Sequence, residues 1–399
     1  MTRPATAAVI GTGFIGPVHV EALRRAGVRV AGILGSSPAK SQAAADALGL
    51  PRGYGDLNEL LADESVDAVH VASPNRHHFE QAAAAIRAGR HVLCEKPLAM
   101  TSQQTAELVA LAASSDRVCG VAYNIRFYPL CHEAAARVRD GSVGAVRHVV
   151  GSYVQDWLLK DTDFNWRVSA REGGPLRAVA DIGTHWLDLA QFVAGQPVVA
   201  VMADLQTVHA TRHRPTGSTE TFTGAADPAK AEATATEAAQ TEPVAIDTDD
   251  AGCILLRFAG GARGCLHVSQ TTAGRKNCLR LEVAGSEQSL AFDSESPNRL
   301  WIGHRDRANE SLLRDPGLIS PAAAAIASTP GGHNEGFPDT FKQLFRTFYR
   351  AVAEGGIADD SPLPTFADGD REVRLCEAIL TSHRTQSWVE VDPVPEGSR

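Results

Sequence analysis

Several features that would place this chain in a common class of protein are missing from its sequence. No apolar run approaches the roughly 18 residues that a membrane-spanning helix needs, so we expect no membrane partner. The formal net charge of −9 disfavours the clustered basic surface of a nucleic-acid-binding protein, so no nucleic-acid partner is expected. Residues 1–6 lead directly into an apolar, strand-like run, which leaves no room for a secretory signal peptide.

Paired cysteines are also missing. The seven cysteines are odd in number and scattered, and no two of them form a C-x-x-C motif. A disulfide framework or a structural zinc site would need paired or regularly spaced cysteines. We therefore expect reduced cysteines in a cytoplasmic protein, and no metal site.

The length and composition predict a folded protein with two domains. The chain has 399 residues, 44% hydrophobic and 21% charged, which is enough for a sizeable buried core. Strands such as Val28–Leu34 and Asp67–Ala72 alternate with helices such as Pro38–Leu48 and Ser102–Ser114. This alternation is typical of βαβ units with a parallel sheet. We expect an α/β, doubly wound Rossmann domain over residues 1–125.

The pattern changes in residues 126–399, where strands follow one another with one clear helix between them, Ile182–Val193. This predicts an α+β domain with a large, open, mainly antiparallel sheet. Two late helices, Pro338–Val352 and Asp368–Thr381, are expected to pack back near the domain junction. Residues 209–248 have few large apolar side chains, which predicts a flexible insertion. The expected strands are Val146–Val154, Val198–Val208, Ala251–Phe258, Gly264–Ser269, Leu279–Val283 and Leu290–Asp293.

A glycine-rich turn follows the first expected strand, Ala7–Ile10. In such G-x-G-x-x-G turns the first glycine permits the tight bend, the second lets a pyrophosphate approach the backbone, and the third allows close helix packing. The following helix offers its N-terminus to the phosphates. The turn predicts a dinucleotide cofactor bound through Gly11, Gly13, Phe14, Ile15 and Gly16.

The residues after the second strand bear on which dinucleotide is bound. NAD-binding proteins usually carry an acidic residue there, for the ribose 2′-hydroxyl. Here the segment is Leu34-Gly35-Ser36-Ser37-Pro38-Ala39-Lys40, without a carboxylate. Ser36, Ser37 and Lys40 could hold a 2′-phosphate instead, which favours NADP. The alternative is that Lys40 is only a solvated helix residue.

Asp181 and His185 are candidate catalytic residues. They lie four apart at the start of the helix Ile182–Val193 and can project from one face. Asp181 is placed like an N-cap, and a carboxylate beside an imidazole suits general acid–base chemistry. The alternative is a helix cap plus a buried, hydrogen-bonded histidine.

Polar and aromatic residues just upstream of Asp181 suit a hydroxylated ligand. The loop Glu172-Gly173-Gly174-Pro175 lets the backbone lie close to a ligand. Trp157 and Trp166 could equally be core residues. The candidate ligand-binding residues here are Asp156, Trp157, Asp163, Asn165, Trp166 and Arg167.

Together these segments resemble the glucose–fructose oxidoreductase/inositol dehydrogenase/rhizopine catabolism (Gfo/Idh/MocA) family. The motifs that carry the resemblance cover most of the chain. They are the glycine turn, Ser73-Pro74-Asn75…His78, Cys94-Glu95-Lys96-Pro97, and Gly173-Gly174…Asp181-Ile182-Gly183-Thr184-His185…Asp188. Two features depart from the family pattern: Gly35 in place of an acidic residue, and the insertion at 209–248.

The resemblance implies roles for residues by position. Lys96, Asp181 and His185 match the catalytic triad, and Pro97 matches a proline whose preceding bond is typically cis. Further positions implied to contact the cofactor are Ser73, Pro74, Asn75, His78, Glu95, Lys96, Asn124 and Arg167. Those implied to contact the substrate are Lys96, Tyr123, Arg126, Tyr153, Asp156, Trp157, Trp166, Asp181 and His185. His333, in a glycine-rich loop before a helix, is a further substrate candidate, although a surface loop histidine fits equally well.

The resemblance also implies an activity. We expect an NAD(P)-dependent oxidoreductase that moves a hydride between a secondary alcohol of a sugar or cyclitol and the nicotinamide. One alternative is a redox-neutral sugar-modifying enzyme with tightly bound cofactor, acting by epimerisation or glycoside cleavage. Another is a non-catalytic nucleotide or sugar sensor. The second domain of the family commonly mediates oligomerisation, so a homodimer or homotetramer through the C-terminal sheet is expected.

Overall fold

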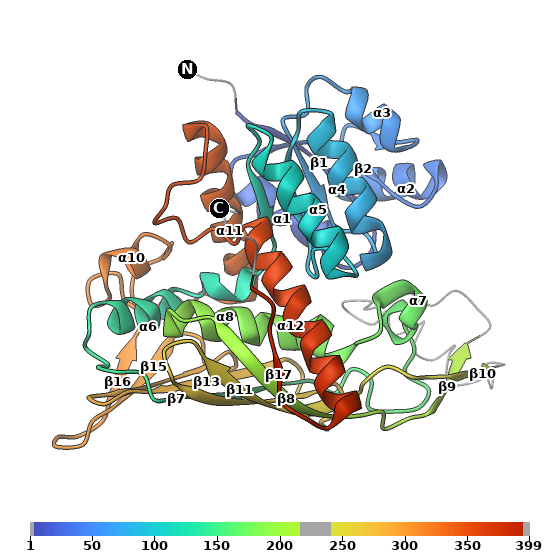
Figure 1. The fold of residues 1–399 in the computed structure, drawn as a ribbon. Helices are drawn as coiled ribbons and strands as arrows, with labels where there is room; N and C mark the ends of the chain where they lie inside the picture. Colours follow the sequence, from blue (N-terminus) through green and yellow to red (C-terminus); the bar gives the residue numbers. More distant parts are fainter. Residues whose placement is uncertain (1–3, 216–240, 394–399) are drawn as a thin grey trace.

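The computed structural model describes residues 4–215 and 241–393 and shows two layers, each a sheet with its covering helices, packed against each other (Figure 1). The first layer is built on a six-stranded parallel sheet in the order β3-β2-β1-β4-β5-β6. This order confirms the predicted doubly wound fold. The strands are β1 (Thr6–Ile10), β2 (Arg29–Leu34), β3 (Gly53–Tyr54), β4 (Ala68–Val71), β5 (His91–Cys94) and β6 (Cys119–Val121).

Helices cover both faces of this sheet, so its strands are buried apart from first residues such as Arg29 and have an apolar core on each side. Side-chain caps fix several helix starts: Ser37 accepts from the Lys40 amide, Asp56 from Glu59, and Thr101 from Gln104. The helices are α1 (Ile15–Arg25), α2 (Pro38–Leu48), α3 (Leu57–Ala62), α4 (His78–Arg87) and α5 (Ser102–Ala113), with a 3₁₀ turn η1 (Asn75–His77).

The second layer is an open nine-stranded sheet in the order β16-β15-β14-β13-β7-β12-β11-β8-β17. All its strand pairs are antiparallel except β7 with β12, which confirms the predicted mainly antiparallel sheet. Every strand expected from the sequence is present, and β15, β16 and β17 were not anticipated. The strands are β7 (His148–Val154), β8 (Val198–Gln206), β11 (Ala251–Phe258), β12 (Arg263–Ser269), β13 (Cys278–Ala284), β14 (Ser289–Asp293), β15 (Arg299–Gly303), β16 (Glu310–Leu313) and β17 (Val389–Glu390).

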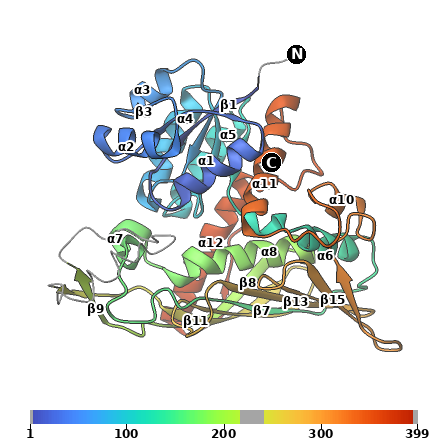
Figure 2. The same ribbon diagram turned by 180° about the vertical axis from the view of Figure 1, so that it is seen from behind.

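One face of this sheet carries helices and the other is bare (Figures 1 and 2). Trp186 of α8 is fully buried in the core between helices and sheet, and donates to the Arg280 carbonyl of β13. The covering elements are α6 (Pro129–Arg139), α8 (Thr184–Ala194) and α12 (Phe366–Thr385), with short turns η2 (Asn124–Phe127), η3 (Trp166–Val168), α7 (Ala170–Gly173), η4 (Val179–Gly183) and α10 (Pro321–Ala324).

The two late helices join the layers. Helix α11 (Phe337–Glu354) lies against α1, and its Phe341, Leu344, Phe345 and Phe348 enter the core of the first layer. Helix α12 contacts both α5 and β8. The sequence placed both helices correctly, although each is longer than expected.

The predicted insertion, residues 209–248, is only partly within the described residues. Its two flanks form an antiparallel pair, β9 (Thr211–Pro215) with β10 (Thr241–Ala245), so the expectation of flexibility is wrong for them. Buried Arg212 is the physical reason, because it donates to Asp250 and to the Leu158 and Lys160 carbonyls. Residues 216–240 lie outside the described part, where flexibility stays a prediction.

Among the residues that the structure describes, no helix is long and apolar enough to cross a membrane.

Candidate active site

The glycine turn between β1 and α1 has the shape that a dinucleotide pyrophosphate needs. Gly11 has φ +119°, and a Cβ there would lie 2.2 Å from the Ala72 carbonyl oxygen. A Cβ on Gly16 would lie 2.0 Å from the Gly11 oxygen, so neither position can take another residue without shifting backbone. A Cβ on Gly13 meets nothing within 4 Å, and Phe14 is exposed, so the second glycine faces open space where phosphates can approach.

The end of β2 leaves little room for an acidic side chain. A Cβ on Gly35 would lie 3.0 Å from Thr12 Cγ2 and 3.2 Å from the Ser41 amide nitrogen. The Gly35 amide donates to Ser41 Oγ, and the Ser37 hydroxyl caps α2. Ser36 and Lys40 are exposed at this helix start.

Lys96 and Asp181 meet across the junction of the two layers. Lys96 follows β5, and its peptide bond to Pro97 is cis, as the family resemblance implied. The Lys96 ammonium donates to the Asp181 main-chain oxygen at 2.7 Å and to Asp181 Oδ1 at 2.9 Å. The two residues are 85 positions apart, so only the fold brings them together.

Asp181 is not the N-cap that the sequence suggested. It lies inside the π-helical turn η4, which runs directly into α8. The cap is supplied by buried Asp249, whose carboxylate accepts from the Arg177 amide at 2.6 Å and the Val179 amide at 2.9 Å. The Asp181 carboxylate can therefore bind other groups. Single π-helical turns are frequently found at functional sites.

Three groups surround the Asp181 carboxylate. Besides Lys96, the Arg167 guanidinium lies 3.2 Å from Oδ1, and Gln270 Nε2 donates to Oδ2 at 2.9 Å. Burial would raise the pKa of Asp181, but the charges of Lys96 and Arg167 hold it well below its usual range. Asp181 is thus a fixed anion that positions Lys96. Arg167, predicted to bind cofactor, belongs to this cluster.

His185 lies beside the cluster but is not hydrogen-bonded to Asp181, which corrects the expected carboxylate–imidazole pair. Its Nδ1 is buried and has no hydrogen-bond partner among the described residues. The Tyr123 ring packs edge-on against it with centroids 5.7 Å apart, and the Tyr153 ring lies at 6.3 Å. Burial, and next the Lys96 charge, lower the pKa of His185 to about 3. His185 is therefore neutral at neutral pH.

The Ser73–His78 segment supports the site. His78 is buried and its ring nitrogens bridge the Pro97 and Ser73 carbonyls, at 2.7 and 2.8 Å. Asn75 donates to the Gly173 carbonyl, which ties this segment to the glycine loop of the second layer. A neutral imidazole has one N–H, so His78 donates to one of these two carbonyls and helps to hold the loops, while its contact with the cofactor stays a prediction. Pro74 precedes the turn η1 in an extended conformation.

Four more predicted ligand contacts have other partners in the structure. Arg126 is buried and binds both Asp188 oxygens, with Asp368 nearby. Asn124 is buried and donates to Thr340 Oγ1, and Asp156 accepts from Lys276 and from the Gly274 amide. His333 is exposed in a loop whose carbonyl accepts from Arg314. A local motif cannot reveal such partners, because each comes from a segment at least 14 residues away.

Trp157 and Trp166 are half-buried on the loop that borders Asp181. The Arg167 guanidinium lies 4.5 Å from the Trp166 ring centre, so Trp166 helps to orient the arginine that pairs with Asp181. The loop packs on the β9–β10 pair through an apolar cluster of Leu158, Val168 and Ile246.

Two residues that contact the site could not be predicted from the sequence. Gln270 follows β12 and reaches Asp181 from 89 positions away. His19 on α1 lies 3.1 Å from Glu95, the residue before Lys96. Neither stands in a motif with its partner, so no spacing argument could have found them.

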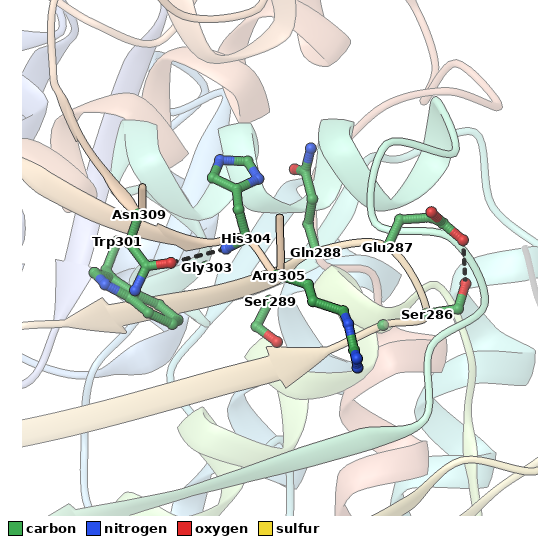
Figure 3. A pocket seen from close by; sticks show the side chains of 10 residues that line it. Ser286, Glu287, Gln288, Ser289, Trp301, Gly303, His304, Arg305 and Asn309 are labelled. Atoms are coloured by element: carbon green, nitrogen blue, oxygen red, sulfur yellow. Dashed lines mark hydrogen bonds between the residues drawn. The ribbon is translucent and has the colours of Figure 1, made fainter. Parts of the chain in front are cut away.

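A surface hollow and a cluster of possible metal-binding side chains lie away from this site. A hollow of about 300 Å³ is lined by the turns after β13 and β15, including Gln288, Trp301 and His304, and contains none of the predicted site residues (Figure 3). Cys278, Asp293 and Glu295 lie close enough to hold a metal ion, but both carboxylates already pair with Arg280 and Arg275. The expected absence of a metal site stays a prediction.

Sequence models of known families match both layers. Residues 5–123 match the model described as "Oxidoreductase family, NAD-binding Rossmann fold", and residues 131–291 match the "GFO/IDH/MocA C-terminal domain". The chain belongs to the Gfo/Idh/MocA oxidoreductase family.

Relatives within the Gfo/Idh/MocA family cover almost the whole chain. Levoglucosan dehydrogenase of Pseudarthrobacter phenanthrenivorans is 29% identical over 90% of this chain and 88% of its own. An oxidoreductase domain protein from Kribbella flavida is 30% identical, with a TM-score of 0.84 over 98% of this chain and 100% of its own. An inositol dehydrogenase homolog from Azotobacter vinelandii, solved with NADH and myo-inositol, is 26% identical, with a TM-score of 0.80 over 98% of each chain. The chain is therefore an oxidoreductase, and its first layer matches an NAD-binding Rossmann fold.

Proposed function

We propose that this protein oxidises a secondary alcohol of a sugar or cyclitol with a nicotinamide dinucleotide, using Lys96 and His185 for acid–base catalysis. The observation that carries the proposal is the Lys96–Asp181 pair beside neutral His185, at the carboxyl ends of the Rossmann strands where such cofactors bind. Relatives that act on levoglucosan and bind myo-inositol support the polyol substrate class.

Each residue of the proposed site has a defined task. The bound nicotinamide supplies the hydride acceptor. His185 takes the proton of the substrate hydroxyl through Nδ1, which has no hydrogen-bond partner among the described residues. An ammonium has three N–H donors, and Asp181 engages two of those of Lys96, so one remains for the substrate oxygen. Asp181 fixes that donor in place with both its carboxylate and its main-chain oxygen.

A panel of anhydrosugars, monosaccharides and inositols, assayed with NAD and NADP separately, tests the activity. We expect Lys96→Ala and His185→Gln each to lower kcat by about 100-fold or more, as acid–base assistance is lost. The control is His132→Gln, which replaces another buried imidazole that lies between Phe127 and Phe192. Near-normal rates in both site variants, or an equal loss in the control, would contradict the assignment.

We propose NADP as the preferred cofactor. The crowding around Gly35 leaves little space for the acidic side chain that binds a 2′-hydroxyl, and Ser36 and Lys40 are exposed at the adjoining helix start. We expect Lys40→Ala to raise KM for NADP about tenfold, the size of one charge-assisted hydrogen bond, with little change for NAD. Equal effects on the two cofactors would rule this preference out.

We also propose a cytoplasmic homodimer or homotetramer formed through the bare face of the nine-stranded sheet. Leu255 of β11, Trp301 of β15 and Leu313 of β16 are large apolar side chains exposed on the sheet, and exposed apolar surface can mark an interface. We expect Leu255→Lys with Trp301→Lys to reduce the molar mass measured by light scattering to that of one chain. An unchanged mass would place the interface elsewhere.

A further inference from the structure

A chain of four polar side chains runs through the apolar core behind Lys96. Tyr349 Oη lies 2.9 Å from His70 Nε2, His70 Nδ1 lies 3.0 Å from His19 Nδ1, and His19 Nε2 lies 3.1 Å from Glu95 Oε1. Both histidines are fully buried, and Tyr349 is half-buried. The chain crosses four elements: α11, β4, α1 and the end of β5.

Aromatic residues of α11 enclose the two histidines. Phe345 packs on His19 and His70, with centroid distances of 4.9 and 4.7 Å, and Phe341 adds a further contact with His19. Burial, and next the proximity of His19, lower the pKa of His70 well below its ordinary value. His70 is therefore neutral, with one ring nitrogen that donates and one that accepts.

When His19 is neutral, the partners fix the direction of every hydrogen bond. Ionised Glu95 only accepts, so His19 Nε2 carries a hydrogen and the Nδ1 of neutral His19 accepts. His70 must donate to it through Nδ1, which leaves His70 Nε2 as an acceptor for the Tyr349 hydroxyl. With neutral His19, one order of donors therefore runs from the Tyr349 hydroxyl at one end of the chain to ionised Glu95 at the other.

Glu95 is where the chain reaches the site. Its other oxygen, Oε2, accepts from the Lys96 amide at 3.2 Å, so the carboxylate stays close to the catalytic loop. Burial would raise the pKa of Glu95, but the His19 hydrogen bond and the charge of Lys96 keep it below its ordinary value. A reversed His19 tautomer would present a lone pair to Glu95 and favour protonation of the carboxylate.

We propose that Tyr349, His70 and His19 are positioning residues, which hold Glu95 as an ionised acceptor beside Lys96 and His185 by fixing one order of donors along this chain. The effect of Glu95 on turnover rests on the proposed function. The tautomers of the histidines do not depend on it.

The test compares Tyr349→Phe with Tyr54→Phe in the full-length protein. Tyr54 is the matched control, because it is buried in the same domain and its hydroxyl donates to Asp63 at 2.9 Å, away from this chain. Ring ¹⁵N NMR reports the tautomers, with His19 and His70 signals assigned through His19→Gln and His70→Gln. Steady-state kinetics with the preferred cofactor and polyol report kcat and KM.

In the unchanged protein we expect His19 protonated on Nε2 and His70 on Nδ1. Tyr349→Phe should mix the tautomers of both histidines and lower kcat/KM about three- to tenfold, the size of one hydrogen bond, while Tyr54→Phe changes neither. Unaltered His19 and His70 signals in Tyr349→Phe would overturn the proposal, as would altered tautomers with unchanged kinetics or an equal loss in Tyr54→Phe. If no polyol is turned over by the unchanged protein, the proposed function fails, while the NMR comparison still decides the order of donors.

Discussion

Individual residues at this site owe their properties to partners far away in the sequence. Lys96 is held by Asp181, Asp181 by Arg167 and Gln270, and Glu95 by His19. The motifs predicted Lys96, Asp181 and His185 as the catalytic residues, but they could not reveal the protein partners of Arg126, Asn124 and Asp156. Motifs indicate which chemistry is present, whereas burial and ion pairing depend on the assembled fold.

A buried histidine away from the site allows a direct test of how burial controls charge. Burial, and next the charges of Arg139 and Arg126, lower the pKa of His132 to about 3, and its Nε2 has no hydrogen-bond partner in the described chain. His132 then binds a proton in the unfolded state but not in the folded state, so the free energy of unfolding falls as the pH drops from about 6.5 towards 3. At pH 5 this costs about 2 kcal/mol.

We expect His132→Leu to remove that cost. Between pH 8 and pH 5 its unfolding free energy, measured in urea, should fall by about 2 kcal/mol less than that of the unchanged protein. The difference in unfolding free energy between the two proteins at pH 8, where the histidine is neutral in both states, reports packing alone and serves as the reference. Identical losses over this pH range would show that His132 does not remain neutral in the fold.

Among the elements, the π turn η4 matters most for the site, because it carries Asp181 into α8. The sequence predicted the helix nearly correctly, yet it could not predict the cap. Asp249 lies 70 positions after Val179, and its carboxylate caps the turn from the loop that precedes β11. Strands β15 to β17 were missed for a related reason: they are short strands at or next to the sheet edges, stabilised by their neighbours rather than by a strong pattern of their own.

Removing this cap should affect stability and catalysis together. We expect Asp249→Ala to destabilise the fold by about 1–2 kcal/mol and to lower kcat, because the turn that positions Asp181 loses its support. Asp56→Ala removes a cap of the same chemistry from α3 and should cost only stability. If both variants have normal kcat after correction for the folded fraction, the turn does not depend on Asp249 for its position.

At the scale of the whole molecule, the site exists only because two layers are held against each other. The sequence predicted both layers, their order and the late helices, because alternating and successive strand patterns differ clearly. It could not predict that α11 would supply the wall behind His19 and His70, since that packing joins residues far apart along the chain. Nor could it place the β9–β10 flanks, which are anchored by one buried arginine in an otherwise polar segment.

The fate of the hydrogen on the substrate carbon tests the central claim most directly. A polyol from the active panel, deuterated at its carbinol carbons, should transfer deuterium to the nicotinamide, and mass spectrometry of the recovered cofactor should show one deuterium. Lys96→Ala should still bind the cofactor but transfer deuterium at least about 100-fold more slowly. Reduced cofactor without deuterium, or transfer that is unchanged when Lys96 and His185 are both replaced, would contradict the account.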